Sequence, residues 1–151
     1  SVQRPLHLGA ALAGAYDRLH EPLTRYGRPV GVAFQLRDDV LGAFGDSVLT
    51  GKPVGDDLRE GKPTPLLATA RARATPSQAS VLRRAGNRAM TDAELRELQE
   101  VMVATGAVSV IETEIRALTD EAMAALGAME LAGGAGEALA DLANFVAFRA
   151  H

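Results

Sequence analysis

Residues that could bind a metal-held polyphosphate are concentrated in one stretch of this sequence. Residues 31–65 contain five of the nine aspartates and both lysines, Lys52 and Lys62. Asp38 and Asp39 are adjacent in a helical pattern, where two ionised carboxylates repel each other unless a cation or a helix terminus relieves them. Mg²⁺ favours such oxygen ligands and typically takes one or two carboxylates together with phosphate and water. The stretch therefore predicts a magnesium and diphosphate site.

The loop after these acids adds features suited to phosphate. Glycines that let a backbone approach a ligand closely stand at four positions: Gly45, Gly51, Gly55 and Gly61. Three further acids could act as outer metal ligands or form turns: Asp46, Asp56 and Asp57. Read alone, the acid pair is more typical of a solvated helix face beside Arg37 than of a metal site. Lys52 read alone is equally typical of an exposed loop lysine. The acid pair, the glycines and both lysines follow one another within a single stretch, and this combination favours the magnesium and diphosphate site.

The elements that position these residues should all be helices. No period-2 pattern indicates a strand, while apolar residues recur at helical spacing. Thr91 and Glu94 match a capping box, which marks a helix start. We expect a loop over 45–65 and helices over the following ranges: 5–20, ending before Pro22, then 29–44, 65–73, 77–85, 91–106, 107–133 and 135–149. These predict an all-α helical bundle with residues 1–151 in one domain.

Each predicted helix has a face that should be buried. On 29–44 this face carries residues spaced by four: Val32, Leu36, Val40 and Phe44. The three C-terminal helices should bury Leu95, Leu98 and Met102, then Ile111, Ile115, Leu118, Ala122 and Leu126, then Leu139, Leu142 and Val146. On the acidic helix, Gln35, Asp38 and Gly42 should lie along one line, with Asp39 about 100° to the side.

The composition of the chain argues against several kinds of partner and of metal site. A formal net charge of -3 gives no electrostatic basis for binding nucleic acid or anionic membrane, and four phenylalanines and two tyrosines form no stacking platform for bases. The chain has no cysteine, which excludes disulfides and thiolate metal sites. No apolar run approaches the ~18 residues that span a bilayer. We expect a cytoplasmic protein that inserts into no membrane.

The acidic stretch resembles the trans-isoprenyl (polyprenyl) diphosphate synthases, of the short-chain farnesyl and geranylgeranyl type. The pattern of the family's second aspartate-rich region is Phe-Gln-x-x-Asp-Asp-x-x-Asp, followed by Gly-Asp, Gly-Lys, Gly-x-Asp-Leu and Glu-Gly-Lys-x-Thr. The matching residues here are Phe34, Gln35, Asp38, Asp39, Gly45, Asp46, Gly51, Lys52, Gly55, Asp57, Leu58, Glu60, Gly61, Lys62 and Thr64.

The resemblance implies an all-α prenyltransferase that condenses isopentenyl diphosphate with an allylic diphosphate by a Mg²⁺-dependent head-to-tail reaction. It implies that Asp38 ligates magnesium and that Asp39 assists directly or through water. Lys52 should contact the departing diphosphate, and Gln35 should line the allylic pocket. Lys62 is assigned either to substrate or to holding the loop, and Arg149 either to closing over diphosphate or to the helix dipole. The complete enzyme should be a homodimer.

Two departures from the family pattern shape this prediction. The third acid of the motif is Gly42 here, which removes one potential ligand. The family's first aspartate-rich motif has no counterpart in these residues, so we expect a C-terminal portion of a synthase that is inactive alone. The alternative function is a non-catalytic helical subunit or remnant that binds or regulates a complete synthase. Product chain length is not encoded in these residues.

Overall fold

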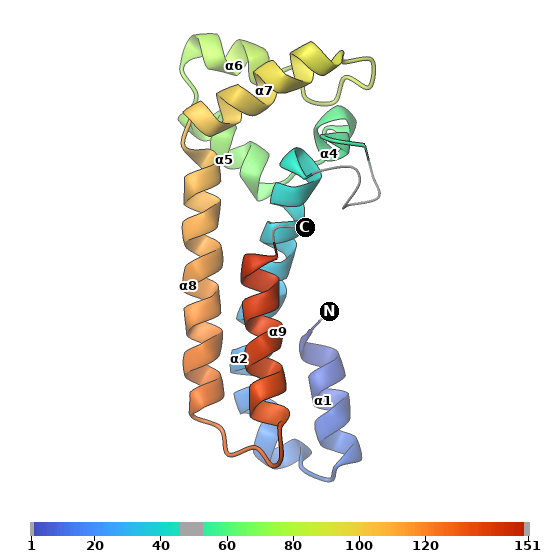
Figure 1. The fold of residues 1–151 in the computed structure, drawn as a ribbon, viewed down its shortest axis with the longest axis vertical. Helices are drawn as coiled ribbons and strands as arrows, with labels where there is room; N and C mark the ends of the chain where they lie inside the picture. The colour runs from blue at the N-terminus through green and yellow to red at the C-terminus, as the bar shows by residue number, and fades with distance from the viewer. Residues whose placement is uncertain (1, 46–52, 150–151) are drawn as a thin grey trace. The chain divides into compact units, whose positions relative to one another are not determined.

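The computed structural model describes residues 2–45 and 53–149 of the chain. Within these ranges every regular element is an α-helix, so the all-α prediction is confirmed (Figure 1). The described residues divide into two compact units, one made of residues 2–35 and 114–149 and the other of residues between 36 and 113. The long helices α2 (Tyr16–Phe44) and α8 (Ala107–Gly127) contribute to both units. None of the described helices combines the length and the apolar character of a membrane span.

The first unit packs helical segments around small and branched apolar side chains. It contains α1 (Gln3–Leu12), the N-terminal part of α2, the C-terminal part of α8, and α9 (Ala135–Phe148). Buried residues recur three or four positions apart, as one face of a helix requires. They are Ala10, Leu23, Tyr26, Val30, Ala33, Ile115, Ala122, Leu126, Ala143, Val146 and Ala147.

Tyr26 joins α9 to α2 inside this unit. Its side chain is fully buried, and its hydroxyl donates a 2.6 Å hydrogen bond to the carbonyl of Leu139. A buried hydroxyl needs such a partner, because leaving it unpaired costs desolvation energy. Burial raises the pKa of Tyr26 to about 12. The tyrosine thus holds in place the helix that ends beside Arg149.

The break after the first helix comes earlier than the sequence predicts. We expected it at Pro22, but the chain turns at Gly14, whose φ of 65° suits a residue without a Cβ. Helix α2 then continues through both Pro22 and Pro29. The residues four positions before each proline, whose carbonyls lose a helical hydrogen bond, are both exposed: Arg18 and Arg25. Water can therefore satisfy those carbonyls while the opposite face of the helix packs in the core.

The second unit is built from the C-terminal part of α2, the N-terminal part of α8 and four shorter helices. These are α4 (Asp56–Glu60), α5 (Pro65–Arg73), α6 (Pro76–Leu82) and α7 (Asp92–Ala104). Helix α6 packs against α7. The buried apolar residues of the whole second unit, including Met90 between α6 and α7, are Leu36, Val40, Ala43, Leu58, Leu66, Leu67, Ala70, Val81, Leu82, Met90, Leu95, Leu98, Met102, Ala107 and Ile111.

Capping side chains define where these short helices begin. Thr64 accepts from the Leu67 amide at the start of α5, where Pro65 takes the first position. The capping box predicted for α7 is confirmed, because Thr91 and Glu94 each bond the other's backbone amide. Helix α6 begins with a second capping box that we did not predict, formed by Thr75 and Gln78. Local side-chain chemistry therefore sets three helix starts.

Other boundaries and faces differ from the prediction. The predicted loop contains α4, because the glycines read as loop formers stand at its two ends. Helix α8 ends at Gly127 and not at the later glycine pair. Val32 is 44% exposed although Leu36 and Val40 are buried. A strict spacing of four drifts by about 40° per step around a helix, so four such residues cannot all share one narrow face. The predicted burial of Leu142, which is 37% exposed, is also wrong.

Candidate active site

The two adjacent acids of α2 lie in different environments. Asp38 is exposed, whereas the side chain of Asp39 is only 3% exposed. Consecutive residues on a helix point about 100° apart, which puts one carboxylate toward solvent and the other into the second unit. A buried carboxylate is costly unless charge and hydrogen bonds compensate for it. Asp38 is therefore the more accessible ligand for a cation, and Asp39 needs partners from the protein.

Lys62 is one partner of Asp39. Its Nζ lies 3.4 Å from Oδ1 of Asp39 and donates a 2.9 Å hydrogen bond to Oδ2 of Asp57. The Lys62 side chain is 43% exposed and that of Asp57 is 12% exposed. The hydrogen bond to Asp57, with a smaller contribution from the charge of Asp39, raises the pKa of the Lys62 amine above its usual value. Lys62 thus remains a cation between two carboxylates.

Backbone geometry at the end of α4 brings Lys62 to this position. The Gly61 amide bonds the Leu58 carbonyl at 3.2 Å, and the Lys62 amide bonds the Asp57 carbonyl at 3.0 Å. This pair of bonds is a Schellman motif, which requires a left-handed residue. Gly61 supplies it with a φ of 69°, and Gly86 packs against it, 2.7 Å from where a Cβ would lie. The motif folds Lys62 back toward the first turn of its own helix.

Arg37, which precedes the acid pair, forms a bidentate ion pair that the sequence did not predict. Its Nη1 and Nη2 donate to Oε1 and Oε2 of Glu112 at 2.5 and 2.8 Å. The side chains are 11% and 27% exposed, which makes this a largely buried and charge-assisted contact. The two residues are 75 positions apart, so no local pattern could have indicated the pairing.

The remaining predicted site residues are placed as follows. Gln35 is exposed on α2 and belongs to the first unit. Arg149 follows α9 in the same unit, and its guanidinium lies 4.3 Å from the centroid of the Phe34 ring, a cation–π contact. Lys52 lies outside the described residues, as does Asp46. The structure therefore brings together Asp39, Asp57 and Lys62, and it describes Gln35 and Arg149 within the other unit.

Asp38 is the predicted magnesium ligand whose carboxylate the structure leaves exposed. Among residues 2–45 and 53–149, no three His, Cys, Asp or Glu side chains converge into a metal cage built by protein alone. Mg²⁺ often has no such cage, since one or two carboxylates, phosphate oxygens and water complete its coordination. The exposed carboxylate of Asp38 is suited to that kind of site.

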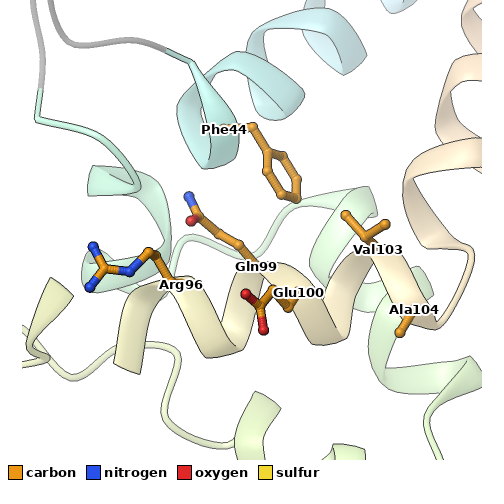
Figure 2. A pocket seen from close by; sticks show the side chains of 6 residues that line it. All are labelled: Phe44, Arg96, Gln99, Glu100, Val103 and Ala104. Atoms are coloured by element: carbon orange, nitrogen blue, oxygen red, sulfur yellow. The ribbon is translucent and has the colours of Figure 1, made fainter. Parts of the chain in front are cut away.

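The second unit also contains a cavity of about 440 Å³ between α7 and the end of α2. Figure 2 shows its lining residues, which are mainly on α7: Phe44, Arg96, Gln99, Glu100, Val103 and Ala104. The Gln99 amide donates to the Ala43 carbonyl at 2.6 Å and so joins α7 to the last turn of α2. Among the described residues, the lining includes none of Gln35, Asp38, Asp39 and Lys62, the residues predicted for the acidic site.

Comparison with known proteins identifies the family. The sequence model of the polyprenyl synthetase family matches residues 1–102. The chain belongs to this family. It is 34% identical over 121 residues to geranylfarnesyl diphosphate synthase of Aeropyrum pernix, covering 80% of the chain and 37% of that protein. It is 40% identical over 115 residues to octaprenyl diphosphate synthase of Escherichia coli K12, covering 76% of the chain and 36% of that protein.

A solved structure of the same family matches nearly the whole chain. This is the geranylgeranyl pyrophosphate synthase of Corynebacterium glutamicum in complex with isoprenyl diphosphate and magnesium, which has a TM-score of 0.93 and 41% sequence identity. The match covers 98% of this chain and 42% of that one. The chain thus spans about two-fifths of the length of these relatives. The fold and the family predicted from the sequence are confirmed.

Proposed function

We propose that this chain supplies the second acidic motif of a head-to-tail prenyltransferase that joins isopentenyl diphosphate to an allylic diphosphate. The observation that carries the proposal is the different exposure of the two adjacent acids: Asp38 is exposed, and Asp39 is buried beside Lys62. Family membership supports the reaction class. The relative solved with isoprenyl diphosphate and magnesium supports the substrate class and the metal.

In this proposal Asp38 holds Mg²⁺ and Asp39 is its immediate support. Bound there, Mg²⁺ would neutralise charge on the oxygens of the departing diphosphate. Lys52 would add a second positive charge to the same leaving group, which is electrostatic stabilisation of a developing charge. Gln35 would line the allylic pocket, and Arg149 would approach the diphosphate. These three roles come from the family resemblance and stay predictions.

Lys62 is better suited to a structural role than to binding diphosphate. Its amine donates to Asp57 and lies near Asp39, and a single cation between two carboxylates leaves a net negative charge. Such a group attracts a cation more readily than an anion. We therefore favour, of the two roles that the sequence left open, the one in which Lys62 holds the loop. The homodimer of the complete enzyme and its cytoplasmic location stay predictions.

The test is a chimera in which this chain replaces the matching portion of the Corynebacterium glutamicum synthase. We expect the chimera to condense radiolabelled isopentenyl diphosphate with an allylic diphosphate. Asp38→Asn should lower the rate by about two orders of magnitude or more, because it removes a ligand that acts on the transition state. The matched control is Asp120→Asn, an exposed aspartate of α8 in the first unit, which should leave the rate unchanged.

The isolated chain gives a second measurement. It should bind an allylic diphosphate weakly and only with Mg²⁺. It should not catalyse condensation, because the resemblance implies that the reaction also needs the family's first aspartate-rich motif, which has no counterpart in these residues. A normal rate in the Asp38→Asn chimera would remove Asp38 from the mechanism. A folded but inactive chimera, together with binding of the isolated chain to an intact synthase, would favour the alternative of a non-catalytic regulatory subunit.

A further inference from the structure

The backbone conformation of Gly42 does not explain why this residue is a glycine. It lies inside α2 and is absent from the glycines with positive φ, so its conformation suits any residue. A glycine inside a helix destabilises it by roughly 0.5–1 kcal/mol relative to alanine. The reason for glycine here must therefore be space.

The carboxylate of Asp57 occupies that space. A Cβ built on Gly42 would lie 2.6 Å from Cγ of Asp57, 3.3 Å from its Cβ, and still closer to Oδ2. Real Cβ atoms essentially never lie as close to other atoms as this one would to Cγ and Oδ2, so any residue larger than glycine would have to displace the Asp57 carboxylate. That displacement is opposed by Lys62, which holds the same Oδ2 at 2.9 Å. Gly42 thus forms the seat in which the Asp57 carboxylate rests.

The seat is connected to the acid pair through charge. Gly42 lies three residues after Asp39 on the same helix, so the two positions are neighbours on its surface. Lys62 contacts Asp57 and Asp39 at the same time, with Nζ 2.9 Å from the Asp57 carboxylate and 3.4 Å from that of Asp39. Asp57 is on α4 and Lys62 just beyond it, whereas Asp39 is on α2. The ion pairs therefore fasten α4 and its loop to the turn of α2 that carries Asp38 and Asp39.

We propose that Gly42, Asp57 and Lys62 form a positioning unit for the acid pair: the glycine makes room for the Asp57 carboxylate, which holds Lys62 against the buried Asp39. Asp57 and Lys62 act through Asp39 and do not themselves bind substrate. Asp38 is on the same helical turn as Asp39. Because Lys62 holds Asp39 on the buried face of that turn, the exposed carboxylate of Asp38 is held in one position for the cation. The consequence for cation binding rests on the proposed function, whereas the unit itself is a property of the fold.

A double-mutant cycle on the full 151-residue chain tests the seat. Gly42→Ala should lower the urea midpoint of unfolding, because the new methyl group collides with Asp57. In an Asp57→Ala background the same change should lower the midpoint clearly less, because only the 3.3 Å contact with the Cβ of residue 57 remains and alanine favours the helix. In an Asp57→Asn background, where size is kept and charge is lost, Gly42→Ala should still lower it. A rise in the unsubstituted chain, or equal effects in all backgrounds, would overturn the proposal.

Chemical labelling tests the link to Lys62 with a readout that general destabilisation does not move. The sequence contains two lysines, so acetylation by sulfo-NHS-acetate can be followed at Lys62 relative to Lys52 by mass spectrometry under folded conditions. Asp57→Asn and Gly42→Ala should each raise the Lys62 to Lys52 ratio several-fold, because the amine loses its hydrogen-bonded carboxylate. An unchanged ratio in both variants would overturn the proposal. The control is Asp92→Asn, an acid paired with Arg59 in the same unit, which should leave the ratio unchanged.

Mn²⁺ titration in the presence of an allylic diphosphate, followed by electron paramagnetic resonance, tests the consequence for the cation. Both Asp57→Asn and Gly42→Ala should weaken Mn²⁺ binding by the full chain several-fold, and Asp38→Asn should abolish it. Undiminished Mn²⁺ affinity in both positioning variants would overturn the positioning role. If the unsubstituted chain bound no Mn²⁺, the proposed function would fail. The urea midpoints and labelling ratios would still decide whether Gly42, Asp57 and Lys62 form the positioning unit.

Discussion

Replacing Tyr26 with phenylalanine removes one hydroxyl from the core of the first unit and should change how stability depends on pH. In the native chain the hydroxyl donates to the Leu139 carbonyl at 2.6 Å, and burial raises the pKa of Tyr26 from 10.0 to about 12. Loss of one such hydrogen bond costs about 0.5–1.5 kcal/mol. Tyr26→Phe should therefore be less stable than the native chain near neutral pH by about that amount.

The difference should reverse at alkaline pH. Between pH 10.0 and about 12 the unfolded chain has lost the tyrosine proton and the folded chain still holds it, so stability falls as pH rises. A pKa difference of about two units corresponds to about 2.7 kcal/mol across this window. Phenylalanine has no proton to lose, so the two stability curves should cross between about pH 10 and 11, where the alkaline loss equals the contribution of the hydrogen bond.

Urea unfolding followed by circular dichroism at a series of pH values from about 8 to 12 would measure this crossing. The matched control is Tyr16→Phe, because the ring of Tyr16 is 42% exposed and its removal should leave the alkaline fall in place. Parallel curves for Tyr26→Phe and the native chain would refute the reasoning. That result would mean that burial does not hold the phenol in its neutral form.

Two further predictions concern packing. Gly61→Ala should destabilise the chain by about 1–2 kcal/mol or more, since φ is 69° and a Cβ would lie 2.7 Å from the Cα of Gly86. Gly9→Ala, a helical site with nothing within 4 Å, should instead stabilise by about 0.5–1 kcal/mol in the same urea assay, and an equal loss at both glycines would contradict the argument. Leu98→Ala, at a fully buried site, should cost about 2–5 kcal/mol, whereas Leu142→Ala at a 37% exposed site should cost clearly less.

Local sequence patterns predicted most of the helices. Helical periodicity, the Thr91–Glu94 capping box and the start at Pro65 are confirmed because each depends on residues within one or two turns. The errors came where tertiary packing outweighed local preference. Pro22 and Pro29 did not interrupt α2, because its buried face stabilises the helix across both prolines.

The motif residues themselves could be read from the chain, but their burial and their partners could not. The family resemblance assigned Asp38 to the metal, with Asp39 assisting directly or through water, and it made Gly42 a missing acid. Packing exposes Asp38, buries Asp39 beside Lys62, and fills the space at Gly42 with the carboxylate of Asp57.

What the sequence determined by itself was the helical class, the family and the stretch in which we predict the chemistry, because these depend on residue types and on spacing along one helix. Only the tertiary structure decided which carboxylate faces solvent and which is paired, because the partners come from other elements. Lys62 follows Asp39 by 23 positions and Glu112 follows Arg37 by 75. A helical period states the direction in which a side chain points, and the packed fold alone states what it meets there.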